Sequence, residues 1–183
     1  SVPAFAEDSN FIGAKGCKKC HNKKKSGEQF KIWQKSKHAK AFKLLASKEA
    51  AAKAKEMGIT THPQKAKECL ICHTTGVGSS KESFEKKFSA KDGVQCENCH
   101  GAGSLYKKKK TMKKLRKLRL AGNDKAYNKL AKKVGFTYGN KNTCTDQCHQ
   151  KQRTVDGVTY TNPSYQPFDF DERIKEIAHP VPK

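Results

Sequence analysis

Long apolar runs and an ordinary supply of hydrophobic side chains are both missing from this sequence. Only 34% of its 183 residues are hydrophobic and 31% are charged, which is poor material for an aliphatic core. No apolar stretch approaches the roughly 18 residues that a membrane-spanning helix needs, so we expect no transmembrane segment. Disorder is not indicated either, because 9 Phe, 5 Tyr and a Trp are spread along the chain. These features favour a core built partly from a prosthetic group.

Acidic side chains and arginines are also scarce. The chain has 17 Asp and Glu against 39 Lys and Arg, which gives a formal net charge of +22, and only 4 of the 39 basic residues are arginine. Arginine is the residue suited to bidentate contacts with phosphates and bases, so we expect no nucleic-acid partner. Lysine-rich surfaces steer acidic proteins, and we expect acidic redox proteins or other cytochromes as partners. Many of the lysines can equally form a solvated surface. The densest basic run comprises residues 107–110, Lys113, Lys114, Arg116, Lys117 and Arg119.

All eight cysteines occur in pairs, and a histidine follows each pair directly. In c-type attachment, two thiols form thioethers with the haem vinyl groups and the adjacent histidine binds the iron. A structural zinc site or a disulfide framework would also use paired cysteines, but neither requires a histidine after every pair. The pattern therefore predicts four covalently bound c-type haems. The four motifs are Cys17, Cys20 and His21; Cys69, Cys72 and His73; Cys96, Cys99 and His100; and Cys144, Cys148 and His149.

The fourth motif differs from the other three in its spacing. Three residues separate Cys144 from Cys148, whereas two residues separate the cysteines of each other pair. The extra residue must bulge between the two thioethers, while Cys148 keeps its usual position next to the ligand His149. We expect a haem here too, and a vacant or singly attached fourth site is the alternative.

Few candidates remain for the sixth iron ligand. Apart from the four motif histidines, the chain contains only His38, His62 and His179. If each binds an iron, three haems have two histidine ligands and one haem differs. We expect this haem to be five-coordinate. Met57, Met112 or a lysine could also ligate its iron.

The chain between the motifs predicts short helices and long loops. Residues 28–45 show helical spacing, with His38, Phe42 and Leu45 on one face. Ser47 can cap a helix that Gly58 terminates, and Asn123 or Asp124 can cap another that ends at Gly135. A last helix is expected from Asp169 or Asp171 to about residue 177. Because sustained strand alternation is absent, we expect a mainly α fold packed around the haems.

The uneven spacing of the four motifs, without a repeat between them, predicts one haem-stapled domain, and the first residues suggest an exported protein. Residues 4–6 have the A-x-A pattern of an export-signal cleavage site. We expect residues 1–12 to be a signal remnant or a flexible N-terminus, and residues 13–183 to form a single tetrahaem domain. This predicts a periplasmic or extracellular location. The oligomeric state is not determined by these features.

The residues around the motifs resemble the tetrahaem cytochrome c-554 family, the electron acceptors of hydroxylamine oxidoreductase in ammonia-oxidising bacteria. The matching positions are residues 18–21, Trp33, Ser36 and residues 38–41; residues 69–73 and Gly76; residues 93–103; and residues 163–179. The resemblance implies a mostly helical protein with closely stacked haem pairs. It also implies three bis-histidine haems, His38 and His179 among their distal ligands, and a five-coordinate second haem on His73. Two departures are the spacing of the fourth motif and the lysines after Gly103, where the family carries a distal histidine that His62 would have to replace.

These features predict an electron carrier. A possible open haem on His73 suggests a small-ligand redox enzyme, acting on nitric oxide, hydroxylamine or nitrite, as one alternative. A subunit that polymerises into a haem wire is another. No serine, cysteine or paired-carboxylate constellation indicates hydrolytic chemistry, so no residue is assigned a catalytic role with certainty.

Overall fold

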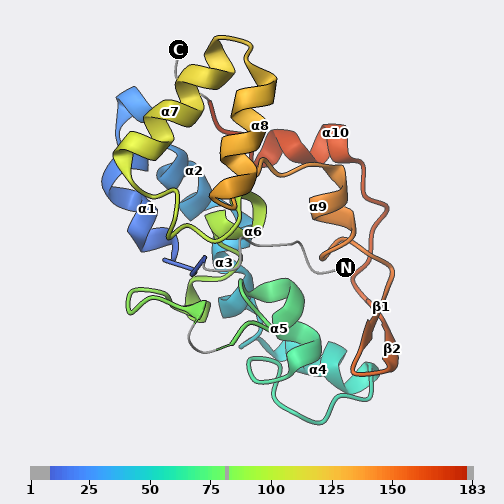
Figure 1. The fold of residues 1–183 in the computed structure, drawn as a ribbon. Coiled ribbons are helices and arrows are strands. Elements are labelled where there is room, and N and C mark those ends of the chain that lie inside the picture. Colours follow the sequence, from blue (N-terminus) through green and yellow to red (C-terminus); the bar gives the residue numbers. More distant parts are fainter. Residues whose placement is uncertain (1–8, 81–82, 181–183) are drawn as a thin grey trace.

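The computed structural model describes residues 9–80 and 83–180. The described chain is mainly helical, and most helices are short (Figure 1). The α-helices are α1 (Ala14–His21), α2 (Gln29–Lys35), α3 (Lys37–Leu44), α4 (Lys48–Glu56), α5 (Lys67–His73), α6 (Cys96–His100), α7 (Lys109–Leu120), α8 (Asp124–Lys133), α9 (Lys141–Thr145) and α10 (Phe170–Arg173). Short 3₁₀ helices are η1 (Lys24–Ser26), η3 (Ala90–Asp92) and η4 (Ile174–Glu176). This confirms the predicted mainly α class with short helices.

The helix predicted over residues 28–45 is wrong in one respect, because it is broken at Ser36. Ser36 has extended backbone angles (φ −71°, ψ 163°), and its side chain accepts a hydrogen bond from the Ala39 N–H. Serine is a strong helix N-cap, so the second half of the segment begins a helix of its own, α3. The helix that carries His38 is therefore separate from α2.

Three predicted helix caps are confirmed. The side chain of Ser47 accepts from the Ala50 N–H, that of Asn123 accepts from the Ala126 N–H, and that of Asp169 accepts from the N–H groups of Asp171 and Glu172. The last helix is shorter than predicted, because α10 ends at Arg173 and the chain continues as the 3₁₀ helix η4.

A two-stranded antiparallel hairpin was not predicted from the sequence. It pairs β1 (Gln152–Val155) with β2 (Val158–Thr161). Asp156 and Gly157 form its turn with φ values of 50° and 83°. An Asp-Gly turn of this kind matches the twist of the two strands, so this dipeptide was the signal for the hairpin.

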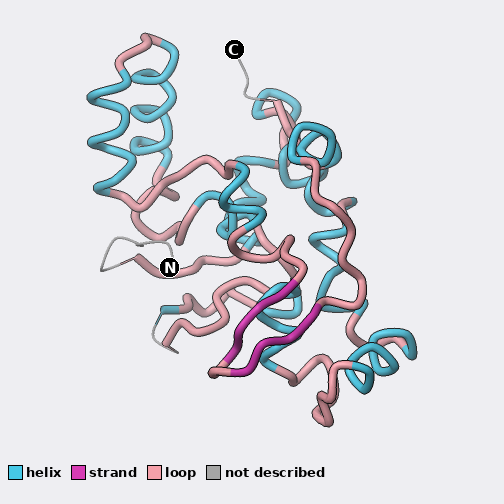
Figure 2. The backbone as a smooth tube through the Cα atoms, turned by 90° about the vertical axis from the view of Figure 1, so that its right-hand side faces the viewer, coloured by secondary structure: helices cyan, strands magenta, loops and turns pink. Residues whose placement is uncertain are grey.

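The hydrophobic core of the described residues is divided into small clusters. One joins Tyr106, Leu115, Ala131 and Val134 between α7 and α8, and another joins Ala54, Ile59 and Ala66. The α7–α8 pair stands at one end of the molecule, and α4, α5 and the β-hairpin lie at the other (Figures 1 and 2). No helix in residues 9–80 and 83–180 is long and apolar enough to cross a membrane.

Candidate functional site

Three of the four cysteine-histidine motifs form short helices that end at their histidines. These helices are α1, α5 and α6, which end at His21, His73 and His100. Because helical residues three apart lie on one face, both thiols of a pair project from the same side. In the fourth motif, α9 ends at Thr145, and the His149 N–H donates to the Cys144 carbonyl at 2.9 Å. This wider turn accommodates the extra residue between Cys144 and Cys148.

Thiols of different motifs lie near each other. The Cys17 thiol lies close enough to that of Cys96 to change its pKa, and the Cys72 thiol is related in the same way to that of Cys148. The neighbouring Cys148 thiol lowers the pKa of the free Cys72 thiol to about 7, whereas burial raises the pKa of Cys99 to about 11, with a smaller contribution from Cys144. The first motif therefore neighbours the third, the third neighbours the fourth, and the fourth neighbours the second.

Hydrogen bonds from the rest of the chain orient three of the motif histidines. The Nδ1 atoms of His73 and His100 lie 3.0 and 2.9 Å from the carbonyl oxygens of Ala41 and Thr137. Since a carbonyl only accepts, each Nδ1 donates and the unprotonated Nε2 is left as a potential metal ligand. His21 Nδ1 lies 3.3 Å from Gln29 Oε1, a longer contact of the same kind. The ring of His149 stacks on Phe168 instead, with centroids 4.2 Å apart.

Two pairs of histidine rings from distant parts of the chain face each other. The ring centroids of His38 and His149 are 6.2 Å apart, and those of His100 and His179 are 5.9 Å apart. Two imidazoles that bind one metal ion at N–metal distances of about 2.0 Å have centroids about 6 Å apart. The spacing of both pairs therefore fits an iron ion between the rings. Burial also lowers the pKa of all four imidazoles, which favours the neutral, ligating form.

The structure does not bring His62 opposite another histidine. Its side chain is exposed, and its Nδ1 accepts from the Gln64 N–H at 3.3 Å within a local turn. Among the described residues, no ring contact joins His62 to another histidine. Of the two methionines, Met112 packs against the α7–α8 core, whereas Met57 lies beside the second motif.

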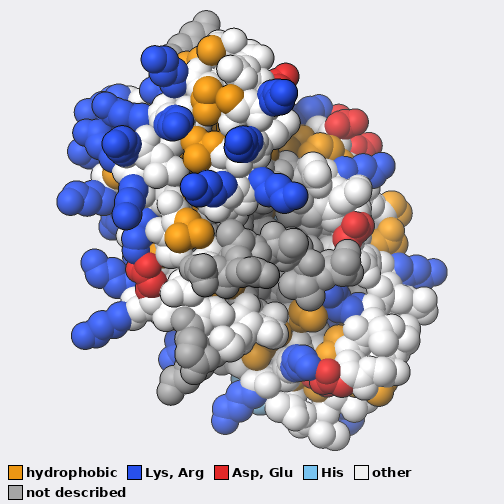
Figure 3. Space-filling model, viewed as in Figure 1, with side chains coloured by type: hydrophobic (Ala, Val, Ile, Leu, Met, Phe, Trp, Pro, Cys, Tyr) orange, Lys and Arg blue, Asp and Glu red, His pale blue; other side chains and the backbone are white. Residues whose placement is uncertain are grey.

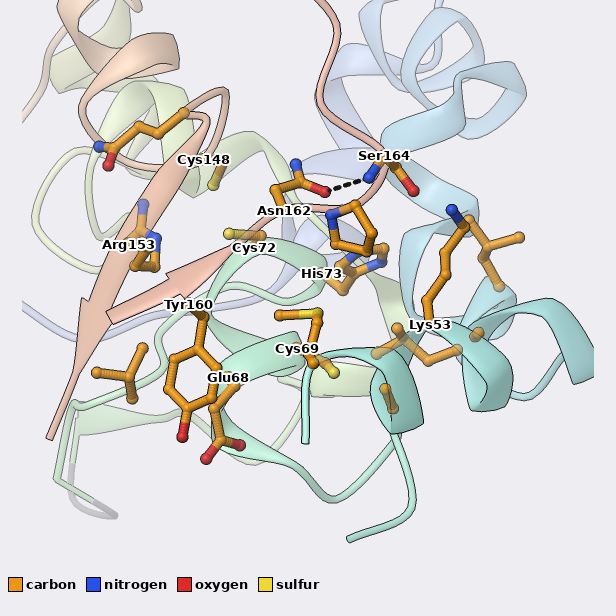
Figure 4. A pocket seen from close by; sticks show the side chains of 18 of the residues that line it. Lys53, Glu68, Cys69, Cys72, His73, Cys148, Arg153, Tyr160, Asn162 and Ser164 are labelled. Carbon is orange, nitrogen blue, oxygen red and sulfur yellow. Dashed lines mark hydrogen bonds between the residues drawn. The ribbon is translucent and has the colours of Figure 1, made fainter. Parts of the chain in front are cut away.

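A cavity of about 220 Å³ opens beside the second motif. Figure 4 shows Cys69, Cys72 and His73 on one side of it and Arg153 and Tyr160 of the β-hairpin on another. Leu45 of the segment after α3 and Met57 of the segment after α4 complete an apolar part of the wall. His73 is the one histidine among the residues that line this cavity. A flat cofactor held by Cys69, Cys72 and His73 would find space here and no second imidazole.

Two buried polar residues that sequence reasoning missed join the motifs together. The Glu97 side chain is 1% exposed and accepts from the N–H groups of Ile12, Gly13 and Gly103 at 2.7–2.8 Å. Gln95 Oε1 accepts from the Ala14 N–H at 2.7 Å. The residues that lead into the first motif are therefore fixed to the third. Burial raises the pKa of Glu97, and the three N–H donors partly oppose this rise.

The segment before the third motif also positions His38. The Val94 N–H donates to the His38 carbonyl at 3.0 Å, and Trp33 Nε1 donates to the Val94 carbonyl at 2.8 Å. Gly93 (φ +78°) allows this approach, because a Cβ there would lie 2.5 Å from the His38 carbonyl oxygen. Gln29 Nε2 similarly donates to the Pro180 carbonyl at 3.1 Å and holds the segment that carries His179.

Paired thiols on histidine-terminated turns, together with opposed imidazoles, define a multihaem c-type cytochrome as the class of protein. The family model "Cytochrome c554 and c-prime" matches residues 16–101, so this segment is similar to that family of haem proteins. The chain is 34% identical over 111 residues to "Cytochrome c-554" of Nitrosomonas europaea. This alignment covers 58% of the chain but only 45% of the relative. No solved structure matches the chain significantly. The predicted resemblance is confirmed.

Proposed function

We propose that this chain is a tetrahaem c-type cytochrome that transfers electrons between redox partners. The observation that carries the proposal is the pairing of each of two motif histidines with a distant histidine at the spacing that one iron ion requires. Each haem, when bound, supplies an iron that takes up and releases one electron. The protein's part is to hold these groups close together and to control their ligands and solvation.

The eight cysteines would hold the haems as thioethers, and His21, His73, His100 and His149 would be the proximal ligands. His38 would be the distal ligand opposite His149, and His179 the distal ligand opposite His100. Neither His21 nor His73 has an opposing histidine among the ring contacts of the described residues. The proposal therefore assigns two bis-histidine sites where the sequence predicted three, and it leaves His62 without an iron to bind.

The contacts between thiols support a linear order of the four sites. Cys17 meets Cys96, Cys99 lies near Cys144, and Cys148 meets Cys72. Groups attached at these positions would follow one another in the order first, third, fourth and second motif. Such an order would let an electron that enters at one site pass to the neighbouring sites. We further propose a periplasmic location and acidic redox proteins as partners, in keeping with covalent haem attachment and the net charge of +22.

Electron paramagnetic resonance (EPR) of histidine variants tests the assignment. His38→Ala and His179→Ala should each convert one low-spin ferric haem into a high-spin haem, because a bis-histidine site loses one strong-field ligand. His62→Ala is the matched control and should leave the spectrum unchanged. The intact mass should show four attached haems. A low-spin count that falls in the His62 variant, or that is unaffected in the other two, would contradict the ligand assignment. A colourless protein from a cytochrome-maturing host would contradict the function.

A second candidate function is a redox reaction of a small ligand beside His73. The cavity of about 220 Å³ favours it, because a haem there would have no second histidine and would lie near the cationic side chain of Arg153. Carbon monoxide added to the reduced protein should then shift the Soret band of one haem. An unchanged spectrum would rule out an open site.

A further inference from the structure

More than half of the net charge of the protein lies on one helical hairpin. Residues 107–135, which include α7 and α8, contain 13 Lys and Arg and a single acidic residue, Asp124. This gives a net charge of +12 for the segment out of +22 for the chain. Lys and Arg side chains gather at the α7–α8 end of the face in Figure 3. The charge is therefore concentrated in a defined patch.

The apolar side chains of the hairpin are already used for its own packing. Leu115 is 2% exposed and Ala131 6% exposed, and both pack with Tyr106 and Val134 between the helices. The large hydrophobic side chains exposed on or beside the hairpin are Leu120 (63%) and Tyr138 (38%). A basic surface with a small apolar contact is typical of brief electrostatic encounters, whereas membrane binding by an amphipathic helix needs a broad apolar face.

The hairpin is directly connected to the proximal histidine of the third motif. The Arg119 guanidinium lies 4.2 Å from the centroid of the Tyr138 ring, and Tyr138 meets the His100 ring edge-on at 5.9 Å. Phe136 stacks on His100 with ring centroids 5.6 Å apart and planes 4° apart. Thr137, between these two aromatic residues, accepts the hydrogen bond from His100 Nδ1. A protein bound to the hairpin near Arg119 would thus lie next to the third site.

We propose that the α7–α8 hairpin, with Tyr138 beside it, is the docking surface for an acidic one-electron redox protein that exchanges electrons at the third motif. This inference rests on the proposed electron-carrier function and adds the place of docking. A nucleic acid fits less well, because only Arg116 and Arg119 among the 13 basic residues are arginine. Lysines attract an acidic protein over a distance and accelerate encounter without requiring a tight complex.

The test compares two variants that remove the same charge from different places. In the hairpin variant, Lys113, Lys117, Lys129 and Lys133 are changed to Gln, and all four are exposed. In the control variant, the equally exposed Lys43, Lys48, Lys55 and Lys65 are changed to Gln. The oxidised holoproteins are mixed with reduced plant-type ferredoxin, a strongly acidic protein of low potential, and the second-order rate constant is measured at about 10 mM and 200 mM salt. Complex formation with oxidised ferredoxin is followed separately by NMR titration.

At low salt, the hairpin variant should react about tenfold more slowly than the unmodified protein and bind ferredoxin correspondingly more weakly, and the control should change less than about twofold. The difference should disappear at high salt. Equal losses in both variants would overturn the proposal, because net charge alone would then explain them. A hairpin-dependent affinity for vesicles containing phosphatidylserine or for an oligonucleotide, without an effect on the ferredoxin reaction, would also overturn it. Failure of the unmodified holoprotein to accept electrons from dithionite would instead contradict the electron-carrier function.

Discussion

The motif region and the α7–α8 hairpin are held together by different forces. Around the motifs, the largest fully buried side chains are the polar ones of Gln95, Glu97 and Thr75. Between α7 and α8, the buried side chains are mainly aliphatic or aromatic, such as those of Leu115 and Val134. The hairpin therefore has a small conventional core, whereas the motif region depends on directed hydrogen bonds and on whatever the thiols and imidazoles bind. We infer that the bound cofactors supply most of the missing apolar contact in the motif region.

The largest expected effect follows from preventing cofactor attachment. A variant in which all eight cysteines are changed to serine should lose most of its helical circular-dichroism signal, because its remaining core is too small to offset the conformational entropy. Amide exchange should be fast in residues 9–104 and slower in the hairpin, although an isolated hairpin of this length is marginal. The holoprotein is the control. A cysteine-free variant that unfolds cooperatively with the native circular-dichroism spectrum would show that the motif region needs no cofactor.

Replacing Glu97 should have the next largest effect. Glu97→Ala leaves the N–H groups of Ile12, Gly13 and Gly103 without their acceptor in a buried place, and we expect a loss of about 3 kcal/mol or more in the free energy of unfolding. Guanidinium unfolding followed by the Soret band measures this loss. Glu56→Ala, on the exposed side of α4, is the control and should change stability by less than about 0.5 kcal/mol. Similar midpoints for both variants would show that Glu97 does not join the first and third motifs.

Local patterns in the sequence predicted the mainly α fold, the caps and the sites at which haem chemistry is proposed. Ser47 and Asn123 cap their helices as expected because a cap depends on a few neighbouring residues. The roles of Glu97 and Gln95 could not be predicted, because their partners at residues 12–14 are more than 80 positions away. The sequence feature that could have pointed to the role of Glu97 is its position between Cys96 and Cys99, close to the Gly-Ala-Gly run at residues 101–103. The pairing of His38 with His149 was equally out of reach, because it depends on the tertiary fold.

Leu115→Ala should destabilise the hairpin and leave the motif region nearly unchanged. Leu115 is 2% exposed in the α7–α8 core, and such a truncation costs about 2–4 kcal/mol. We expect faster amide exchange in residues 109–133 with little change in the Soret-monitored midpoint. Leu120→Ala is the matched control, because Leu120 is 63% exposed. If Leu115→Ala lowers the Soret midpoint as much as Glu97→Ala does, the two regions unfold as one unit and the contrast between them is wrong.

The smallest expected effect is a pH dependence of stability that comes from the buried carboxyl group of Glu97. Burial raises the pKa of Glu97 above its ordinary value of 4.5, so at mildly acidic pH the folded protein holds a proton that the unfolded chain has lost. The part of the stability that this bound proton contributes is therefore complete below the ordinary pKa and is lost as the pH rises through the raised value. Relative to Glu97→Gln, which does not titrate, the unmodified protein should lose stability as the pH rises from about 4.5 towards neutrality. A comparison that stays flat over this pH range would show that the Glu97 carboxylate is fully stabilised by the three N–H donors.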